Sequence, residues 1–293
     1  MNNNSTSEAI LREQRQIRRE QFFTNKGLMI GLIVFSIIVL AALIIPAVSD
    51  VDPMAMDIVN RLKPPSPEHI FGTDEFGRDL FTRVLYGARN SLLVGCSVAF
   101  FSCLLGTIIG IYAAYFKLLD HILMRVCEGL IAIPGILLAI ALMAALGATN
   151  TNVIVALTIV YTPSVARVVR SSALVTKEQT FVEAAKVQGS GSGRILWKLI
   201  LPNVISPLAV QASYIFAQAI ISEASLSFLG AGIPAPAASW GNILQASKMI
   251  LSKAPWTVIF PGLAVVLCVL SLNLLGDGLR DFLDPRTAGR RKK

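Results

Sequence analysis

Six long apolar runs constrain this sequence more than any other feature. Each is about 20 residues long, the length at which an α-helix crosses the roughly 30 Å hydrocarbon core of a bilayer. Charged residues make up only 15% of the 293-residue chain, against about 25% in an ordinary soluble domain. These runs predict an all-α, multi-pass membrane protein with six transmembrane helices, at 28–48, 91–116, 122–146, 153–169, 204–229 and 257–275.

The hydrophilic stretches between the runs divide the chain into five segments. We predict an N-terminal tail, a first transmembrane helix, a long loop, a core of five helices and a C-terminal tail, at 1–27, 28–48, 49–89, 90–278 and 279–293. Near the end of the loop, Asp79 and Arg83 have i,i+4 spacing beside an apolar face, which predicts a short helix on the membrane surface or on the bundle. Pro134 and Pro163 predict a kink and an interruption within two of the spans.

The distribution of lysine and arginine predicts the orientation in the membrane. With six spans, both termini lie on one side, and 19 of the 26 basic residues fall there. The positive-inside rule then places the termini and the polar segment 171–203 in the cytoplasm, and loop 49–89 outside it. The excess of lysine and arginine on the cytoplasmic side therefore explains the net charge of +8. Membrane lipid is an expected partner, and nucleic acid is not.

The segment 183–202, EAAKVQGSGSGRILWKLILP, is polar, basic and rich in glycine although it lies between two apolar runs. We interpret it as a helix, a turn at Gly189 and a second helix that Leu201 and Pro202 close. Gly189 allows the backbone conformation that ends a helix. A helix–turn–helix outside the lipid predicts a docking site for a water-soluble partner, whereas a plain connecting loop would not need this pattern.

This segment resembles the EAA loop of ATP-binding-cassette (ABC) importer permeases. In those proteins an EAA triplet, a glycine and a Leu-Pro pair recur at these spacings, with an aliphatic residue before the pair. The matching residues are Glu183, Ala184, Ala185, Gly189, Leu199, Leu201 and Pro202. Leu199 stands where the family usually has isoleucine, which is a conservative change. The resemblance implies that these residues dock an ATPase, and that the position of Glu183 forms an ion pair with it.

Two further motifs narrow the resemblance to the dipeptide/oligopeptide/nickel permeases. FGTDEFGRD at 71–79 is followed by YGARNSLL at 86–93, and NLLGDGLRDFLDPR at 273–286 resembles the C-terminal signature of the C-type subunit. The family implies a type I importer fold in the bacterial inner membrane. It also implies a heterodimer with a homologous permease, two ATPase subunits and an extracytoplasmic binding protein. Peptides are the expected substrate; nickel, a metal chelate or glutathione are alternatives, and an ion-coupled secondary transporter is a remote one.

The sequence carries no catalytic or cofactor motif of its own. It lacks G-x-x-x-x-G-K-[ST], and the glycine-serine run at 189–194 has neither the required lysine nor a preceding strand. G-x-S-x-G and H-E-x-x-H are also absent. The only histidines are His69 and His121, which are too few for a histidine metal site. We therefore expect a transport subunit that is not an enzyme, with no metal or cofactor, whose partners bind the ATP.

Three polar residues in the fifth span are candidates for the pathway or an interface: Glu223, Gln218 and Gln211. An unpaired carboxylate within a membrane is costly, so Glu223 should contact water or a polar group. Lining of the pathway and a structural or intersubunit hydrogen bond both remain open.

Two further spacings predict contacts between helices. Gly106 and Gly110 form a GxxxG pair, which predicts close helix packing. Arg125 and Glu128, three residues apart, predict a structural ion pair near the membrane interface.

Overall fold

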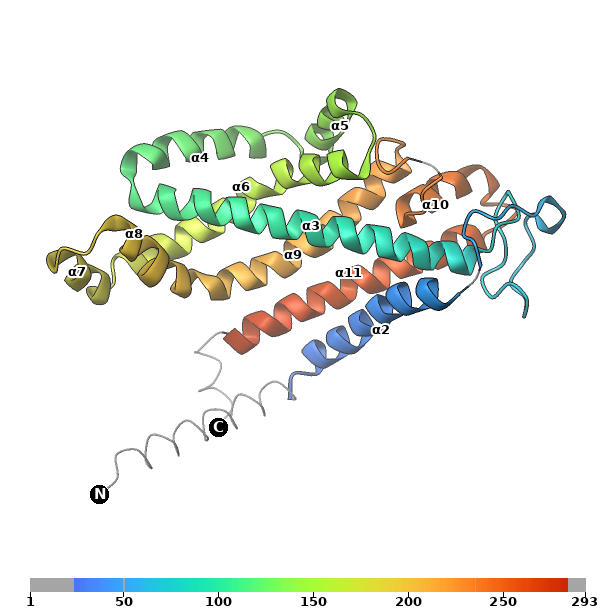
Figure 1. The fold of residues 1–293 in the computed structure, drawn as a ribbon, viewed down its shortest axis with the longest axis horizontal. Helices are drawn as coiled ribbons and strands as arrows, with labels where there is room; N and C mark the ends of the chain where they lie inside the picture. The colour runs from blue at the N-terminus through green and yellow to red at the C-terminus, as the bar shows by residue number, and fades with distance from the viewer. Residues whose placement is uncertain (1–23, 50, 235, 284–293) are drawn as a thin grey trace, which may run out of the picture.

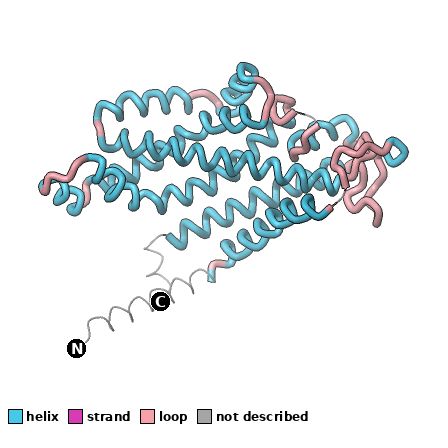
Figure 2. Tube along the Cα trace, in the orientation of Figure 1, coloured by secondary structure: helices cyan, strands magenta, loops and turns pink. Residues whose placement is uncertain are grey.

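The structure is a computed structural model that describes residues 24–49, 51–234 and 236–283. Within these ranges the chain is an elongated bundle of helices with no β-strand; one isolated bridge joins Thr73 and Asp79. Figure 2 shows that most of the irregular chain gathers at the two ends of the bundle. At one end lies α7, and at the other lie α10 and the loop 51–79 (Figure 1).

Among the described residues, five helices or helical runs are long and apolar enough to cross a bilayer, and the bent pair α4–α5 is a sixth if both helices count as one span. The long helices are α2 (Lys26–Val48), α3 (Leu80–Tyr115), α4 (Lys117–Ile131), α5 (Gly135–Leu146), α6 (Asn150–Lys177), α9 (Leu201–Phe228) and α11 (Trp256–Leu283). The short elements are η1 (Ile58–Asn60), α7 (Thr180–Val187), α8 (Ser192–Arg194), η2 (Ile195–Ile200), α10 (Trp240–Ala246) and η3 (Ser247–Ile250). Five of the six predicted spans are confirmed, although several helices extend beyond them, and the span predicted at 122–146 corresponds to the bent pair α4–α5.

Helix α3 forms the centre of the bundle, where it packs against α6 and α9. The contact with α6 depends on the predicted glycine pair. A Cβ atom at Gly106 would lie 2.6 Å from the Val165 Cβ, and one at Gly110 would lie 2.6 Å from the Ala166 carbonyl oxygen. Both distances are too short for a side chain, so the GxxxG prediction of close packing is confirmed.

The predicted surface helix at 79–89 is wrong, because these residues form the first turns of α3. Asp79 is the N-cap of that helix, and its Oδ2 accepts a hydrogen bond from the Thr82 amide at 2.8 Å. A side chain that caps the helix in this way is turned toward the first-turn amides. It does not reach Arg83, whose Nε lies 3.5 Å from Asp74 instead. The long loop therefore ends about ten residues earlier than predicted.

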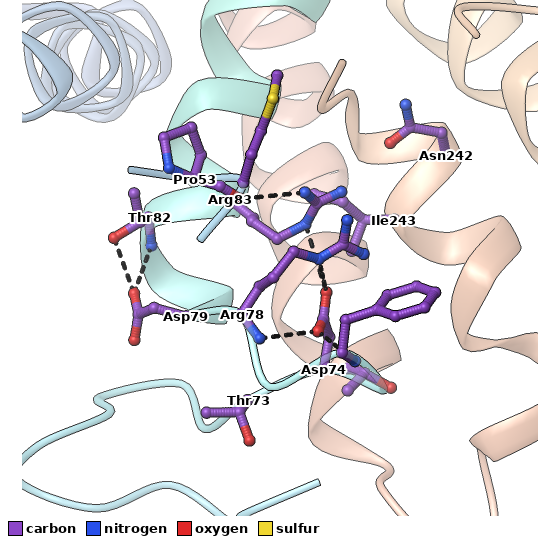
Figure 3. Close-up of polar contacts among 12 residues, drawn as sticks. Pro53, Thr73, Asp74, Arg78, Asp79, Thr82, Arg83, Asn242 and Ile243 are labelled. Carbon is purple, nitrogen blue, oxygen red and sulfur yellow. Dashed lines mark hydrogen bonds and ion pairs between the residues drawn. The ribbon is translucent and has the colours of Figure 1, made fainter. Parts of the chain in front are cut away.

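The segment 71–79 folds around the buried carboxylate of Asp74 (Figure 3). Its Oδ2 accepts from the Arg78 Nε at 2.7 Å and lies 3.5 Å from the Arg83 Nε. Its Oδ1 accepts from the amides of Phe76 and Arg78 at 2.9 and 3.0 Å. Gly77 adopts φ +74°, and a Cβ there would lie 1.7 Å from the Asp57 carbonyl oxygen. These contacts fix the loop to the start of α3.

Two aromatic contacts fasten the same segment to α11. The ring of Phe71 stacks on Phe260 with centroids 4.0 Å apart, and the Trp256 Nε1 donates to the Thr73 carbonyl at 3.2 Å. The residues that carry the resemblance at 71–79 therefore form a tertiary joint at this end of the bundle.

Candidate functional site

The predicted helix–turn–helix at 183–202 is confirmed, and its first helix is α7. Val182 is fully buried, whereas Glu183 in the first turn and Ala184 are exposed. Gly189 ends the helix with φ +78°, and a Cβ atom there would meet no neighbouring atom within 4 Å. The amide of Ser190 donates to the Ala185 carbonyl at 3.0 Å, which closes the turn. Because α7 lies at the extreme end of the bundle, its exposed face is open to a partner (Figure 1).

The sequence predicts that the second helix ends at Leu201 and Pro202. In the structure it continues past them. A continuous helical run from Ser192 to Phe228 joins α8, η2 and α9. The segment η2 has π-helical hydrogen bonds, and the Leu201 amide donates to the carbonyl of Leu196, five residues earlier. Proline has no amide hydrogen and its ring clashes with the carbonyl four residues back. The wider turn ahead of Pro202 lets the helix pass through it.

The predicted docking residues divide into two groups in the structure. Glu183, Ala184 and Gly189 are exposed on or beside α7, with Ala185 half-buried. Leu199 and Leu201 are half-buried and pack against the core cluster that holds Ile195 and Ile200, while Pro202 is exposed at the start of α9. The first group is accessible from outside, whereas the two leucines belong to the packing around the core cluster. They do not form one continuous exposed patch.

Sequence reasoning missed three exposed apolar side chains beside this surface. Phe181 and Val187 on α7 are 43% and 89% exposed, and Trp197 on η2 is 42% exposed. Large apolar side chains without cover commonly mark an interaction site. A helical count from Val182 would have found the two on α7, because each lies away from the buried face.

Glu223 is fully buried and hydrogen-bonded within the chain. Its Oε2 accepts from the Ser91 hydroxyl at 2.7 Å, and its Oε1 accepts from the Ser227 hydroxyl at 2.8 Å. Ser239, the N-cap of α10, supplies a third hydroxyl. The carboxylate thus joins α9, α3 and the start of α10. This arrangement is that of a structural hydrogen-bonding group, so a role in the pathway stays a prediction.

The other two polar candidates lie apart from Glu223. Gln218 is exposed, and its backbone carbonyl accepts a hydrogen bond from the Tyr161 hydroxyl at 3.3 Å. Gln211 is half-buried and lies two turns away on the same side of α9. At 100° per residue, Glu223 points about 140° away from Gln218. The structure therefore does not bring the three residues together.

Comparison with known proteins identifies the family. Residues 106–289 match the family described as binding-protein-dependent transport system inner membrane component. The chain belongs to this family. Residues 14–65 also match the N-terminal transmembrane domain of oligopeptide transport permease C. The chain is therefore a permease subunit of an ABC importer and a multi-pass protein of the inner membrane.

Curated relatives extend this similarity over nearly the whole permease. A putative peptide transport system permease protein of Brucella suis is 49% identical and covers 96% of this chain and 93% of its own length. The dipeptide transport system permease protein of Alkalihalophilus pseudofirmus is 43% identical, over 91% and 88%. The glutathione transport system permease protein of Escherichia coli is 45% identical, over 77% and 75%.

A solved structure shows that the fold is that of a type I importer permease. The MetNI methionine ABC transporter, in inward-facing conformations, matches with a TM-score of 0.58 at 20% identity. The match covers 69% of this chain and 97% of the other. The predicted all-α fold of a type I importer permease is confirmed, whereas the cytoplasmic location of both termini stays a prediction.

Proposed function

We propose that this permease forms half of the pathway of a peptide importer, and that residues 183–202 dock one of its ATPases. In this proposal the other half is a homologous permease, and an extracytoplasmic binding protein delivers the peptide. ATP is bound and hydrolysed by the ATPase subunits, so this chain is not an enzyme and needs no cofactor. The exposed α7 surface at the end of the bundle is the observation that carries the docking role.

The chemistry of α7 suits a partner protein. Glu183 lies in the first turn, where the helix dipole favours a carboxylate, and it is free to pair with a cation. Small exposed Ala184 permits close approach, and Phe181 and Val187 supply apolar surface beside it. A charged group at the centre of an apolar contact gives specificity as well as affinity.

The same region provides a route for mechanical coupling. The buried side chain of Val182 shares a core cluster with Ile195 and Leu196 of η2, so α7 rests on the start of the long run 192–228. Because packed side chains do not deform continuously, we expect a displacement of α7 to move η2 and, with it, the start of α9. Closure of the ATPases would thereby be transmitted into the membrane.

The substrate class is supported by the relatives. Their names specify peptides, a dipeptide and glutathione, and these compounds share amide bonds together with charged amino and carboxyl groups. Peptides are accordingly the substrate that we assign, ahead of nickel or a metal chelate.

Charge reversal at Glu183 tests the docking role. We expect Glu183→Arg to insert and fold normally, because the side chain is exposed, but to lose co-purification with the ATPase subunits. Glu68→Arg makes the same charge change on an exposed residue in the loop at the opposite end of the bundle, and it should retain them. Recovery of the ATPases at wild-type levels with Glu183→Arg would show that the docking assignment is wrong.

A further inference from the structure

A charged hollow of about 370 Å³ lies between α4 and α6. Its polar lining consists of Asp120, His121, Arg125 and Glu128 from α4, with Arg167 and Arg170 from α6. Two of these charges neutralise each other, since Arg170 donates through Nε and Nη2 to the two carboxylate oxygens of Asp120 at 2.5 and 2.7 Å. This bidentate pair fixes the two helices to each other and forms one wall of the hollow.

The two remaining arginines are available to a ligand. Arg167 is exposed and has no hydrogen bond or ion pair with any residue that the structure describes. The Arg125 side chain is 86% exposed, and its only ion pair among the described residues is a 3.8 Å contact with the 59% exposed carboxylate of Glu128. An exposed pair at this distance contributes little. The predicted Arg125–Glu128 pair therefore forms but leaves both groups accessible.

Arg125 and Arg167 lie well inside their helices, away from the ends. Arg125 is about 12 Å from the start of α4, and Arg167 is about 15 Å from the end of α6. Both ends are level, because the Lys177 Nζ at the end of α6 donates to the carbonyls of Ala114 and Tyr115, just before α4 begins. An arginine that faces hydrocarbon costs about 2.5–3.5 kcal/mol. This face of the bundle must therefore contact water or a polar partner.

The exposed surface of α4 has two parts. Leu118, Ile122 and Val126, four residues apart, form an apolar stripe that is 53–73% exposed. His121, Arg125 and Glu128 follow along its flank, on the side toward Arg167. An apolar stripe bordered by charges allows a helix to contact an apolar neighbour on one side and an aqueous space on the other. The hollow lies on the charged side of α4.

We propose that this hollow binds the charged ends of a peptide in transit, with Arg125 and Arg167 holding its carboxylate. Two guanidinium groups match the planar, two-oxygen geometry of that group. Glu128, at the edge of the same hollow, can accept a hydrogen bond from the ammonium group. This inference rests on the proposed function, because a peptide is a substrate that offers both charges together.

The test uses the complete transporter in proteoliposomes, with this permease, its partner permease, the ATPases and the binding protein. Uptake of Ala-Ala, Ala-Glu and the C-terminal amide Ala-Ala-NH2, which has no carboxylate, is measured for the wild type and for Arg125→Gln/Arg167→Gln. Each variant rate is divided by the wild-type rate for the same peptide, so that differences in delivery by the binding protein cancel. We expect a roughly tenfold loss for Ala-Ala and Ala-Glu, the order of one charge-assisted hydrogen bond, and a clearly smaller loss for Ala-Ala-NH2.

Two controls separate charge from structure. Arg125→Lys/Arg167→Lys retains both charges and should recover most of the uptake of Ala-Glu. Lys26→Gln removes one exposed charge at the start of α2, outside the hollow, and should transport all three peptides at the wild-type rate. Co-purification of all subunits verifies assembly of each variant.

Three results would overturn the assignment. An equal loss for the three peptides would mean that the arginines pair with the partner permease and hold the complex together. Wild-type uptake of all three by the glutamine variant would mean that the hollow does not touch the substrate, with the proposed function intact. Failure of the wild-type transporter to take up any of the peptides would remove the proposed function, and this inference with it.

Discussion

Replacing Asp74 by alanine removes the carboxylate around which the segment 71–79 is folded. The side chains of Asp74, Arg78 and Arg83 are each at most 10% exposed, and one carboxylate serves both guanidinium groups. The Arg83 Nη1 has a second acceptor in the carbonyl of Pro53 at 3.2 Å, but this group is neutral. Without Asp74, the buried guanidinium groups of Arg78 and Arg83 would contact no carboxylate among the described residues.

The structure sets the size of the effect. Removal of one partner from a buried ion pair costs about 3–5 kcal/mol, because the remaining charge stays desolvated. Asp74→Ala also removes the acceptor for the amides of Phe76 and Arg78. Asp74→Asn keeps an oxygen for these amides and loses only the charge, so it should cost about half as much. For a chain of 293 residues, 3–5 kcal/mol corresponds to a fall in Tm of roughly 5–8 °C.

Thermal unfolding of the purified permease in one detergent measures this difference. The matched control is Glu75→Gln, the neighbouring carboxylate, which makes no hydrogen bond or ion pair among the described residues. A surface change of this kind should stay within about 0.5 kcal/mol of the wild type. If Asp74→Ala and Glu75→Gln have the same Tm, the carboxylate does not hold the loop, and the reasoning about buried charge is refuted.

Two further perturbations test the core of the bundle by the same thermal assay. Glu223→Gln keeps oxygen and nitrogen atoms near the three serine hydroxyls and should cost about 1 kcal/mol, whereas Glu223→Val leaves those hydroxyls without their acceptor and should cost about 2–5 kcal/mol. Equal Tm values for the two variants would contradict the structural role of Glu223. Gly110→Ala should destabilise by about 1–3 kcal/mol, because its Cβ would lie 2.6 Å from the Ala166 carbonyl oxygen. Gly262→Ala in α11 has nothing within 4 Å and should be neutral or slightly stabilising, so a similar loss at both glycines would argue against the close packing of α3 and α6.

Much of the fold could be predicted from the sequence because the signals involved are local. Span positions follow from runs of apolar residues, and the approach of α3 to α6 follows from Gly106 and Gly110. The end of α7 follows from Gly189. The contacts that fasten a loop to a remote helix could not be predicted in this way. The segment 71–79 is held by Trp256, 183 residues away from Thr73, and no local pattern indicates that pairing.

The candidate docking site shows the same division. Its helices and turn were predictable, since EAA, glycine and Leu-Pro mark their positions. Which members of the motif are exposed was not predictable, because this depends on the packing of Val182 against Ile195 of η2. The motif therefore identifies the segment, and tertiary contacts decide that Glu183 and Ala184 are offered to a partner while Leu199 supports them.

The prolines show most clearly why packing decides the rest. Each removes a helical hydrogen bond, so the sequence predicts a defect at each position. Pro163 is buried among Thr162, Val165 and Ala166, which pack against α3, and α6 continues through it as a helix. Pro134 is exposed, and there the chain bends by 93° between α4 and α5. Contacts on both sides hold α6 together, whereas α4 and α5 have little of this chain to support them.

The bend therefore lies in the part of the permease that we expect other subunits to support. The exposed apolar stripe lies on α4, the helix that ends at this bend. The charged hollow with Arg125 lies along the flank of the stripe. Because α4 carries the exposed Arg125 beside the exposed Leu118, contact with lipid alone would desolvate the guanidinium group. We therefore expect α4 to border both a second subunit and an aqueous path, an arrangement that would account for its few contacts within this chain and for the accessible charges of Arg125 and Arg167.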